Sequence, residues 1–307
     1  MAAGFTWSWS RYRTFDTCPR RFWLSVYAAP LAKRKGVGHP DFEVWVQRHL
    51  MGSAQWAGLA AHEAVEWTLK GAVEGRSVPR QGVMDRTLRQ ARRVLEMSTG
   101  GYFRGDPKTF RGFDAHYYDA EFDGQAALQT LQDKVEKLLD HPILARLLSV
   151  PERIQEVERL SRIRLWGFDI WLSPDVVVAD GRGGFVVVDW KTGRNHASEV
   201  VDGQLGLYGV YVIDRILKVR ADSGRRLPVD RVQGLMAGLG DPAFRTRPLT
   251  AEDVFAARDA MVGSAPKMRG DGVERNGEIP KKEGFPKIPL GSGPCSWCSF
   301  RRTCERE

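Results

Sequence analysis

Several features are missing from this chain of 307 residues, and each absence excludes a class of protein. No apolar run approaches the ~18 residues that a membrane-spanning helix needs. The N-terminal segment carries Arg11, Arg13 and Asp16 among aromatic residues, which excludes a secretory signal peptide. No phosphate-binding loop of the form G-x4-G-K-[ST] occurs, so a motor or a kinase is excluded. We therefore expect a cytoplasmic protein without a membrane partner.

The overall composition favours a folded protein with an anionic partner. Hydrophobic residues make up 42% of the chain, which is enough to form a core. The 46 Lys and Arg residues outnumber the 38 Asp and Glu residues, giving a formal net charge of +8. A basic excess of this size favours an anionic partner without identifying it. The length allows one large domain or two smaller ones.

Hydrophobic periodicity predicts a helical N-terminal half followed by a region rich in strands. We expect helices over 7–27 (broken at Cys18-Pro19), 52–70, 84–97, 115–148, 199–219 and 251–262. Strands are expected over 153–160, 162–171, 175–179, 185–190 and 229–239. The segments 33–40 and 263–294 are rich in Gly, Pro and charged residues, and they are interpreted as a loop and a mobile linker.

Two of the predicted strands form a hairpin that brings charged residues together. The turn sequence 179–184 lies between two valine runs, and a turn centred on Arg182 places Asp175 directly opposite Asp189. Lys191 lies two residues further along and shares their face. Two carboxylates and a lysine can hold Mg²⁺ or Mn²⁺ beside an attacking water. The alternative is a surface salt bridge, and Asp169 is a weaker candidate for the first carboxylate.

Two helical segments carry polar pairs that belong with the hairpin. His62 and Glu66 are spaced i, i+4 and lie on one helical face, from which His62 can reach the carboxylates as a metal ligand. The alternative is a structural histidine. Gln204 and Tyr208 have the same spacing on the helix after the hairpin, and they can contact a phosphate or a base.

The four cysteines suggest a second metal site. Cys295, Cys298 and Cys304 form a C-x2-C-x5-C cluster, and Cys18 is the remaining sulfur that completes a set of four ligands. In a reducing compartment such a set favours metal binding over disulfides. Ligand count leaves both zinc and a [4Fe–4S] cluster open. The alternative for Cys18 is a small buried hydrophobic residue.

Basic and aromatic residues near these cysteines suggest contact with nucleic acid. Closing the metal site would gather four arginines into one phosphate-binding patch, namely Arg20, Arg21, Arg301 and Arg302. Three tryptophans could stack on unpaired bases: Trp7, Trp9 and Trp297. The alternative is that the arginines are solvated and the tryptophans belong to the core.

Taken together, the order of these motifs resembles one known family. The motif order is similar to that of the RecB-like branch of the PD-(D/E)XK nuclease superfamily. It runs from a helix with G-x3-H-x3-E to P-D, then D-W-K, then Q-x3-Y. The cysteines resemble those of its iron–sulfur members, which include CRISPR-associated adaptation exonucleases and AddAB-type nucleases. The resemblance implies an α/β fold with a central mixed β-sheet flanked by helices. It also implies added helices and a [4Fe–4S] clasp that joins the N- and C-terminal segments.

The resemblance also implies roles for individual residues. The metal ligands would be His62, Asp175 and Asp189, with Lys191 supporting hydrolysis. Gln204 and Tyr208 would handle DNA, and the cluster would be ligated by Cys18, Cys295, Cys298 and Cys304. The chain departs from many relatives in two respects. Asp189 stands where they have glutamate, and Gly167-Phe-Asp169 offers a second glycine-led carboxylate that competes weakly with Asp175.

We therefore expect a DNA exonuclease dependent on Mg²⁺ or Mn²⁺ that acts on single strands or DNA ends. Residues 1–50 would form an N-terminal helical segment, 51–262 the nuclease core with a helical insertion at about 78–148, and 263–307 a linker and cluster segment. Unwinding would need a helicase partner, and a CRISPR integrase is another expected partner. The alternatives are a catalytically silent DNA-binding or scaffold subunit, and a zinc-stapled regulatory protein.

Overall fold

The computed structural model describes residues 5–193, 198–220, 226–238, 246–270 and 279–306. At its centre lies a five-stranded mixed sheet with the order β3-β6-β7-β8-β9. Only the β7–β8 pair is parallel. This pair is joined by a helical crossover, as a parallel connection requires. The strands are β3 (Ile154–Val157), β6 (Val176–Ala179), β7 (Phe185–Lys191), β8 (Val232–Gly238) and β9 (Thr246–Pro248).

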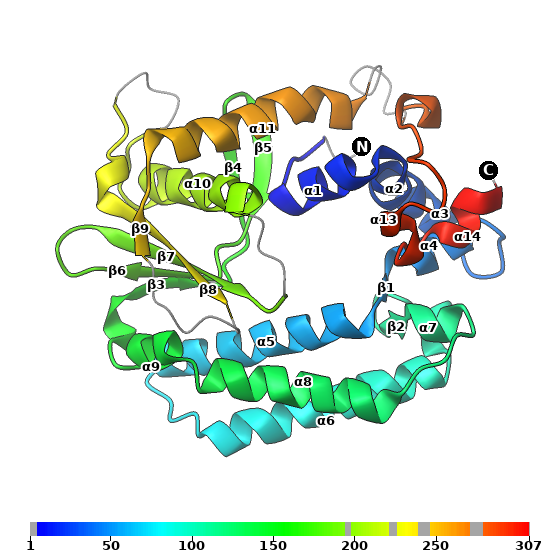
Figure 1. The fold of residues 1–307 in the computed structure, drawn as a ribbon, viewed down its shortest axis with the longest axis horizontal. Coiled ribbons are helices and arrows are strands. Elements are labelled where there is room, and N and C mark those ends of the chain that lie inside the picture. Colours follow the sequence, from blue (N-terminus) through cyan, green and yellow to red (C-terminus); the bar gives the residue numbers. More distant parts are fainter. Residues whose placement is uncertain (1–4, 194–197, 221–225, 239–245, 271–278, 307) are drawn as a thin grey trace.

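Helices cover both faces of this sheet (Figure 1). On one face lie α10 (Ser198–Arg215) and α11 (Ala251–Arg269), and on the other lie α5 (Ser53–Val73), α6 (Arg80–Thr99), α8 (Gly124–Leu139) and α9 (Pro142–Leu148). A hydrophobic core lies on each face of the sheet, and residues of β7 contribute to both. Val188 and Trp190 belong to the core beneath α5, whereas Val187 belongs to the core beneath α10. The predicted α/β sheet flanked by helices is confirmed.

The N-terminal segment forms a chain of short helices, and the C-terminal segment lies beside it (Figure 1). The predicted break at Cys18-Pro19 is confirmed, because Cys18 is extended and Pro19 begins a new helix. Thr303 Oγ1 donates a hydrogen bond of 2.7 Å to Gln47 Oε1 and holds the two segments together. The helices are α1 (Trp9–Thr17), α2 (Pro19–Trp23), a π-helix (Leu24–Ala28), α3 (Ala29–Lys35), α4 (Phe42–Arg48), α13 (Gly293–Ser296) and α14 (Arg301–Arg306).

Several predicted segments differ from the structure. The single strand expected over 162–171 is a hairpin of β4 (Ser161–Leu165) and β5 (Phe168–Leu172), because Trp166 and Gly167 turn the chain with φ of 48° and 84°. The helix expected over 115–148 is divided into α7 (Asp114–Tyr117), α8 and α9, and the loop expected over 33–40 begins later because α3 reaches Lys35. A small parallel pair, β1 (Leu50–Met51) and β2 (Gly112–Phe113), was not predicted.

The segment interpreted as a mobile linker is structured in the parts that can be described. Helix α11 continues to Arg269, and its Ala265 and Met268 are fully buried. Phe285 is also buried, and its ring stacks on Phe22 with 6.0 Å between centroids. Residues 271–278 lie outside the described residues. Among the described helices, none combines the length and apolar character that crossing a membrane would require.

Candidate active site and cysteine hollow

The hairpin register predicted from the turn is confirmed. Val176 pairs with Val188 and Val177 with Val187, so the pairing continues toward Asp175 and Asp189 at the open end of the hairpin. The Asp180 carboxylate closes the turn by accepting hydrogen bonds of 2.7 and 2.9 Å from the backbone N–H groups of Arg182 and Gly184. At the open end, Trp190 N donates to Asp175 Oδ2 at 2.6 Å.

Four side chains form a connected polar network between β7 and α10. Lys191 forms an ion pair with Asp189, and its Nζ also donates to Gln204 Oε1 at 3.1 Å. The Gln204 amide in turn donates to Asp189 Oδ1 at 3.2 Å and to Tyr208 Oη at 2.9 Å. The structure therefore brings Gln204 and Tyr208 to the predicted site and fixes the direction in which the Lys191 ammonium points.

Helix α5 presents His62 to the same end of the hairpin. The close contact between α5 and the end of β7 requires a glycine at position 58. A Cβ atom there would lie 2.7 Å from Oγ1 of Thr192, the residue after Lys191. One turn later, His62 Nδ1 lies 3.6 Å from Asp175 Oδ2 and 3.6 Å from Glu158 Oε1. The structure therefore brings His62 together with the first carboxylate, as predicted.

Glu158 is a site residue that the sequence analysis missed. Antiparallel pairing of Val157 with Val176 places Glu158 beside Asp175, and Glu158 N donates to Asp175 O at 3.0 Å. Its backbone has a φ of 46°, which is uncommon outside glycine. The signal that could have located it is the β3–β6 register, which no short turn sequence defines, because the β4–β5 hairpin separates the two strands.

His62, Glu158 and Asp175 have the donor set and the spacing of a divalent-metal site. One ligand atom from each lies within 4.8 Å of the other two. Burial and, next, the nearby charge of Asp189 are the main causes that raise the pKa of Asp175 to about 8. Burial likewise raises the pKa of Asp189. Carboxylate oxygens beside an imidazole suit Mg²⁺ or Mn²⁺, and such a cation would offset the repulsion between these carboxylates once they ionise.

The protonation of His62 depends on the same carboxylates. Burial lowers the pKa of His62, but its hydrogen bond to Glu158 and the charge of Asp175 raise the pKa overall. Without a cation, the ring therefore serves as a positive partner for these acids. A metal ligand must instead be neutral, so metal binding at His62 would release a proton.

Two other acidic residues lie away from the site. Asp169 belongs to β5 in the separate β4–β5 hairpin and pairs with Arg162 at 2.8 Å. The structure therefore places Asp175, and not Asp169, next to Asp189. Glu66 forms an ion pair with Lys70 at 2.5 Å on its own helix, so the G-x3-H-x3-E motif brings only its histidine to the carboxylates.

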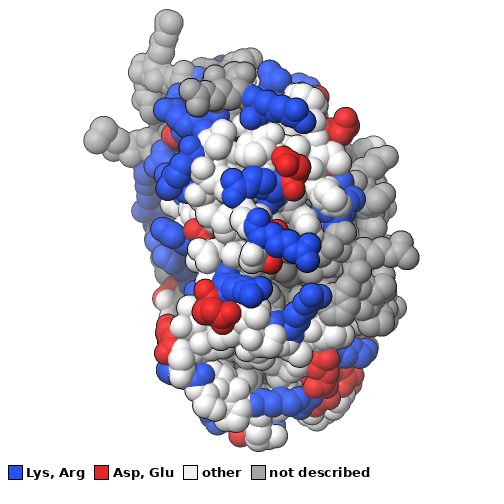
Figure 2. All heavy atoms as spheres, turned by 90° about the vertical axis from the view of Figure 1, so that its left-hand side faces the viewer, with Lys and Arg blue, Asp and Glu red and all other residues white. Residues whose placement is uncertain are grey.

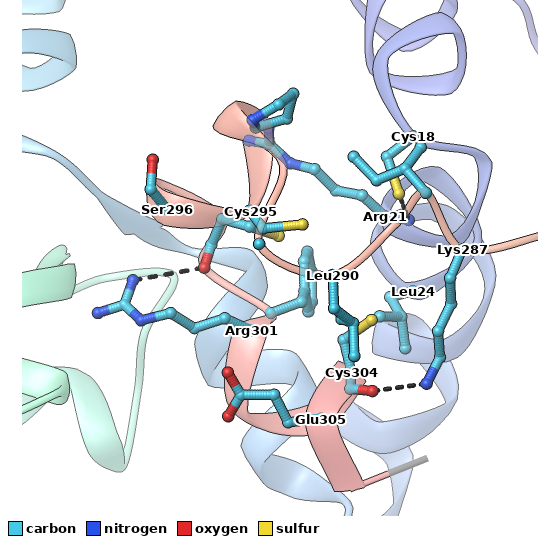
Figure 3. A pocket seen from close by; sticks show the side chains of 15 residues that line it. Cys18, Arg21, Leu24, Lys287, Leu290, Cys295, Ser296, Arg301, Cys304 and Glu305 are labelled. Carbon is cyan, nitrogen blue, oxygen red and sulfur yellow. Dashed lines mark hydrogen bonds between the residues drawn. The ribbon is translucent and has the colours of Figure 1, made fainter.

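The four cysteines line one hollow of about 330 Å³ between the N- and C-terminal segments. Figure 3 shows Cys18 on the N-terminal helices facing Cys295 and Cys304 on the C-terminal segment. Cys18 Sγ caps α2 by accepting from Arg21 N at 3.4 Å, and Lys287 Nζ donates to Cys304 O at 2.6 Å. Burial raises the pKa of the Cys298 thiol.

The four sulfur atoms are not close enough together to bind a single metal ion. Zn²⁺ binds thiolates at about 2.3 Å, which places the sulfur atoms of a zinc site within roughly 4 Å of one another. No three of these sulfur atoms, all in the described part of the chain, lie within 4.8 Å of one another. The four cysteines therefore line one hollow without forming the close group of ligands that a single zinc ion requires.

The arginines predicted to bind phosphate have different surroundings. Arg20 is buried and its Nε donates to Phe285 O at 2.9 Å, so it holds the C-terminal segment and is not available to DNA. Arg302 pairs with Glu43 at 3.7 Å. Arg21 and Arg301 line the cysteine hollow, where Arg21 lies over the Trp297 ring at 4.7 Å.

The tryptophans also differ from one another. Trp7 is fully buried and its Nε1 donates to Ser264 Oγ at 3.0 Å, so it cannot stack on a base. Trp9 is 9% exposed, whereas Trp297 is 53% exposed. The prediction of base stacking is therefore wrong for Trp7.

Comparison with known proteins agrees with this geometry. The chain belongs to the PD-(D/E)XK nuclease superfamily, whose sequence model matches residues 6–305. Membership implies a nuclease that uses divalent metal ions and has DNA as its substrate. Among solved structures, the crystal structure of SSO0001 is 16% identical, covering 62% of this chain and 78% of its own, with a TM-score of 0.29. No curated protein matches the chain.

Proposed function

We propose that this protein is a Mg²⁺- or Mn²⁺-dependent DNA exonuclease that hydrolyses single strands or DNA ends. The observation that carries the proposal is the convergence of Asp175, Asp189 and Lys191 at the open end of one hairpin, with His62 beside them. A subunit that only bound DNA would have no need of two buried carboxylates held next to a lysine. The basic net charge of +8 supports a polyanionic substrate.

The chain's own residues would divide the reaction between them. Asp175, Asp189, His62 and Glu158 would hold the cation, which when bound supplies an activated water and charge neutralisation. Lys191 would donate to the attacking water and then to the negative charge that develops on the phosphate. Gln204 keeps Lys191 in place through its hydrogen bond, and Tyr208 supports Gln204 from the helix.

We also propose that the cysteine hollow holds a [4Fe–4S] cluster ligated by Cys18, Cys295, Cys298 and Cys304. Four thiols around one hollow of about 330 Å³ support this. Because no phosphate-binding loop occurs in the sequence, duplex unwinding would be left to a helicase partner. A CRISPR integrase is a second partner that the RecB-like resemblance suggests.

The function is tested with end-labelled single- and double-stranded DNA incubated with Mg²⁺ or Mn²⁺. Products that shorten stepwise from an end are expected. Lys191→Ala should reduce the cleavage rate by at least about a hundredfold while DNA affinity stays near wild type, because the lysine acts on the transition state. Asp175→Ala should abolish both cleavage and binding of the divalent ion, measured by calorimetry.

The matched control is Asp169→Asn, which alters an acidic residue outside the site and should keep most of the activity. A Lys191→Ala protein that cleaves at the wild-type rate would overturn the active-site assignment. Internal nicks in closed circular DNA would instead show an endonuclease. Absence of cleavage with every metal and DNA form would favour the catalytically silent DNA-binding subunit.

A further inference from the structure

One face of α10 extends the active site into two neighbouring hollows. Gln204, Tyr208, Tyr211 and Arg215 are spaced i, i+4, i+7 and i+11, so they form one stripe along the helix. Tyr208 and Tyr211 are buried in the middle of this stripe, and Gln204 and Arg215 at its two ends line the two hollows. The stripe begins at the polar network around Lys191 and ends at the carboxyl end of α10. At ~1.5 Å per residue, it is about 16 Å long, enough for a few nucleotides of a DNA strand.

The first hollow, which we call the aromatic hollow, adjoins the catalytic network directly. It has a volume of about 480 Å³ and is lined by Trp9, Trp171, Gln204 and Tyr208, with Arg13 at its side. Trp9 lies edge-on to Trp7 and Tyr12, with centroids 6.0 and 5.3 Å away, so its indole is held rigidly. Rigid aromatic walls with a few polar groups suit a flat heterocyclic base.

The second hollow, which we call the basic hollow, lies beyond Leu160, a residue that lines both. It has a volume of about 360 Å³ and is lined by four cationic side chains, namely Arg159, Arg162, Arg215 and Lys218. Leu160 itself is 66% exposed, so an apolar side chain stands between the two hollows. A nucleic-acid strand can match this arrangement, because its bases can contact the apolar surface while its phosphates contact the cations.

The acidic groups near the basic hollow are already neutralised. Glu156 accepts a hydrogen bond from Tyr211 Oη at 2.8 Å and pairs with Arg159 at 3.2 Å, while Asp169 pairs with Arg162. Within the described part of the chain, Arg215 and Lys218 have no carboxylate partner, and Arg215 donates only to the backbone carbonyl of Arg162 at 3.2 Å. Two cations therefore remain for an anion.

The wider surface is compatible with a phosphate chain. The carboxyl end of α10 and the β6–β7 turn lie at the same end of the molecule (Figure 1). On the face that this end presents, Lys and Arg cover more of the surface than Asp and Glu do (Figure 2). The basic residues are spread over the face, so the specific contacts must come from the two hollows.

We propose that a single DNA strand passes from the aromatic hollow over the exposed Leu160 to the basic hollow, with an unpaired base in the first and a phosphate in the second. The proposal rests on the proposed function and names its substrate class. A base can enter the aromatic hollow only when it is not paired and stacked in a duplex, so the geometry selects single strands. Arg215 and Lys218 then hold the strand in register without touching the cleaved bond.

The test measures binding of fluorescein-labelled oligothymidylate by the full chain in EDTA, so that cleavage plays no part. Arg215→Gln/Lys218→Gln should make the slope of log affinity against log salt less negative by about 0.7, because both side chains hold one phosphate and that contact is lost. Trp171→Ala should weaken binding about tenfold through the lost stacking, while Trp171→Phe should stay near wild type. A short duplex should bind more weakly to every variant.

The matched controls are Arg89→Gln/Arg92→Gln, which removes two exposed charges from α6, and Phe255→Ala, which removes an exposed aromatic ring from α11. Neither should alter the salt slope or the affinity. The proposal would be overturned if Arg215→Gln/Lys218→Gln and Arg89→Gln/Arg92→Gln had the same salt slope. It would also be overturned if Trp171→Phe bound DNA as weakly as Trp171→Ala. Intact binding without cleavage under any metal would refute the proposed nuclease and leave the strand path standing.

Discussion

Ionisation of Asp175 is strongly disfavoured in the folded protein. Its side chain is held by the Trp190 amide and faces His62, and burial together with neighbouring carboxylates raises its pKa to about 8. A carboxyl group with a raised pKa resists ionisation in the folded protein. Near neutral pH the metal-free Asp175 is therefore largely protonated, and a cation that binds there must displace this proton.

The raised pKa of Asp175 predicts how the stability of the metal-free protein changes with pH. The pKa of Asp175 is about 8 when folded against 3.8 when unfolded, so the folded state binds the proton more tightly. Its stabilising contribution is present below about pH 4 and is lost as pH rises through 8. The pKa of His62, also raised, acts in the same direction. In EDTA, the melting temperature should therefore fall from acidic toward mildly alkaline pH.

Asp175→Asn serves as the control, because the amide cannot ionise and the pH dependence should become shallower. Added Mg²⁺ should raise the wild-type melting temperature more at the alkaline end of this range, where protons no longer compete for the ligands. A melting temperature that rises with pH in EDTA, unchanged by the substitution, would contradict the electrostatic account.

At the residue scale, the sequence predicted the site where local pairing defines it. Asp175, Asp189 and Lys191 follow from one hairpin, whose register depends only on the turn between its strands. Glu158 could not be found in this way, because it reaches the site through pairing of strands that are distant in sequence. Arg20 and Trp7 were assigned to DNA although both are buried, since burial depends on tertiary contacts that composition does not specify.

At the element scale, α10 and α11 pack unusually closely. A Cβ atom at Gly206 of α10 would lie 2.2 Å from the backbone oxygen of Asp253 in α11, which no side-chain rotation can relieve. Gly206→Ala should therefore push the helices apart and destabilise the protein by about 1–3 kcal/mol. The measurement is urea-induced unfolding followed by circular dichroism.

Gly263→Ala in α11 is the matched control, because a Cβ atom there meets nothing within 4 Å. It should stabilise the protein by about 0.5–1 kcal/mol through helix propensity alone. The packing argument would be wrong if the two substitutions changed the unfolding free energy by the same amount.

Element types were predicted more reliably than element ends. The break at Cys18-Pro19 was correct because proline acts locally on the backbone. The β4–β5 hairpin was read as one strand because Trp166-Gly167 is not a strong turn pair, although both residues adopt positive φ. The linker prediction followed composition, whereas the buried side chains of Met268 and Phe285 show that the segment contributes to the core.

At the scale of the whole molecule, the cysteine hollow joins segments from the two ends of the sequence. Protein purified without oxygen should be brown and contain iron and sulfide, as thiolate-ligated clusters do. Cys18→Ser should lose most of the iron and melt at a lower temperature, because the joined segments close a very long loop. Ser296→Ala, which alters the same hollow without removing a thiol, should keep its iron. Colourless protein with stoichiometric zinc would contradict the cluster.

The contacts between the two ends also have a consequence for synthesis on the ribosome. Trp7 finds its partner Ser264 only 257 residues later, and Phe22 stacks on Phe285. At ~5–20 residues per second, roughly 13–50 s pass before the partner of Trp7 has been translated. During that time, Trp7 can pair with Asp169 and Trp171 of β5, but the part of its core that α11 and Phe285 supply is still missing. The first segment of the chain is therefore among the last to be fully covered, and until then its aromatic side chains are the part of the nascent chain most exposed to aggregation.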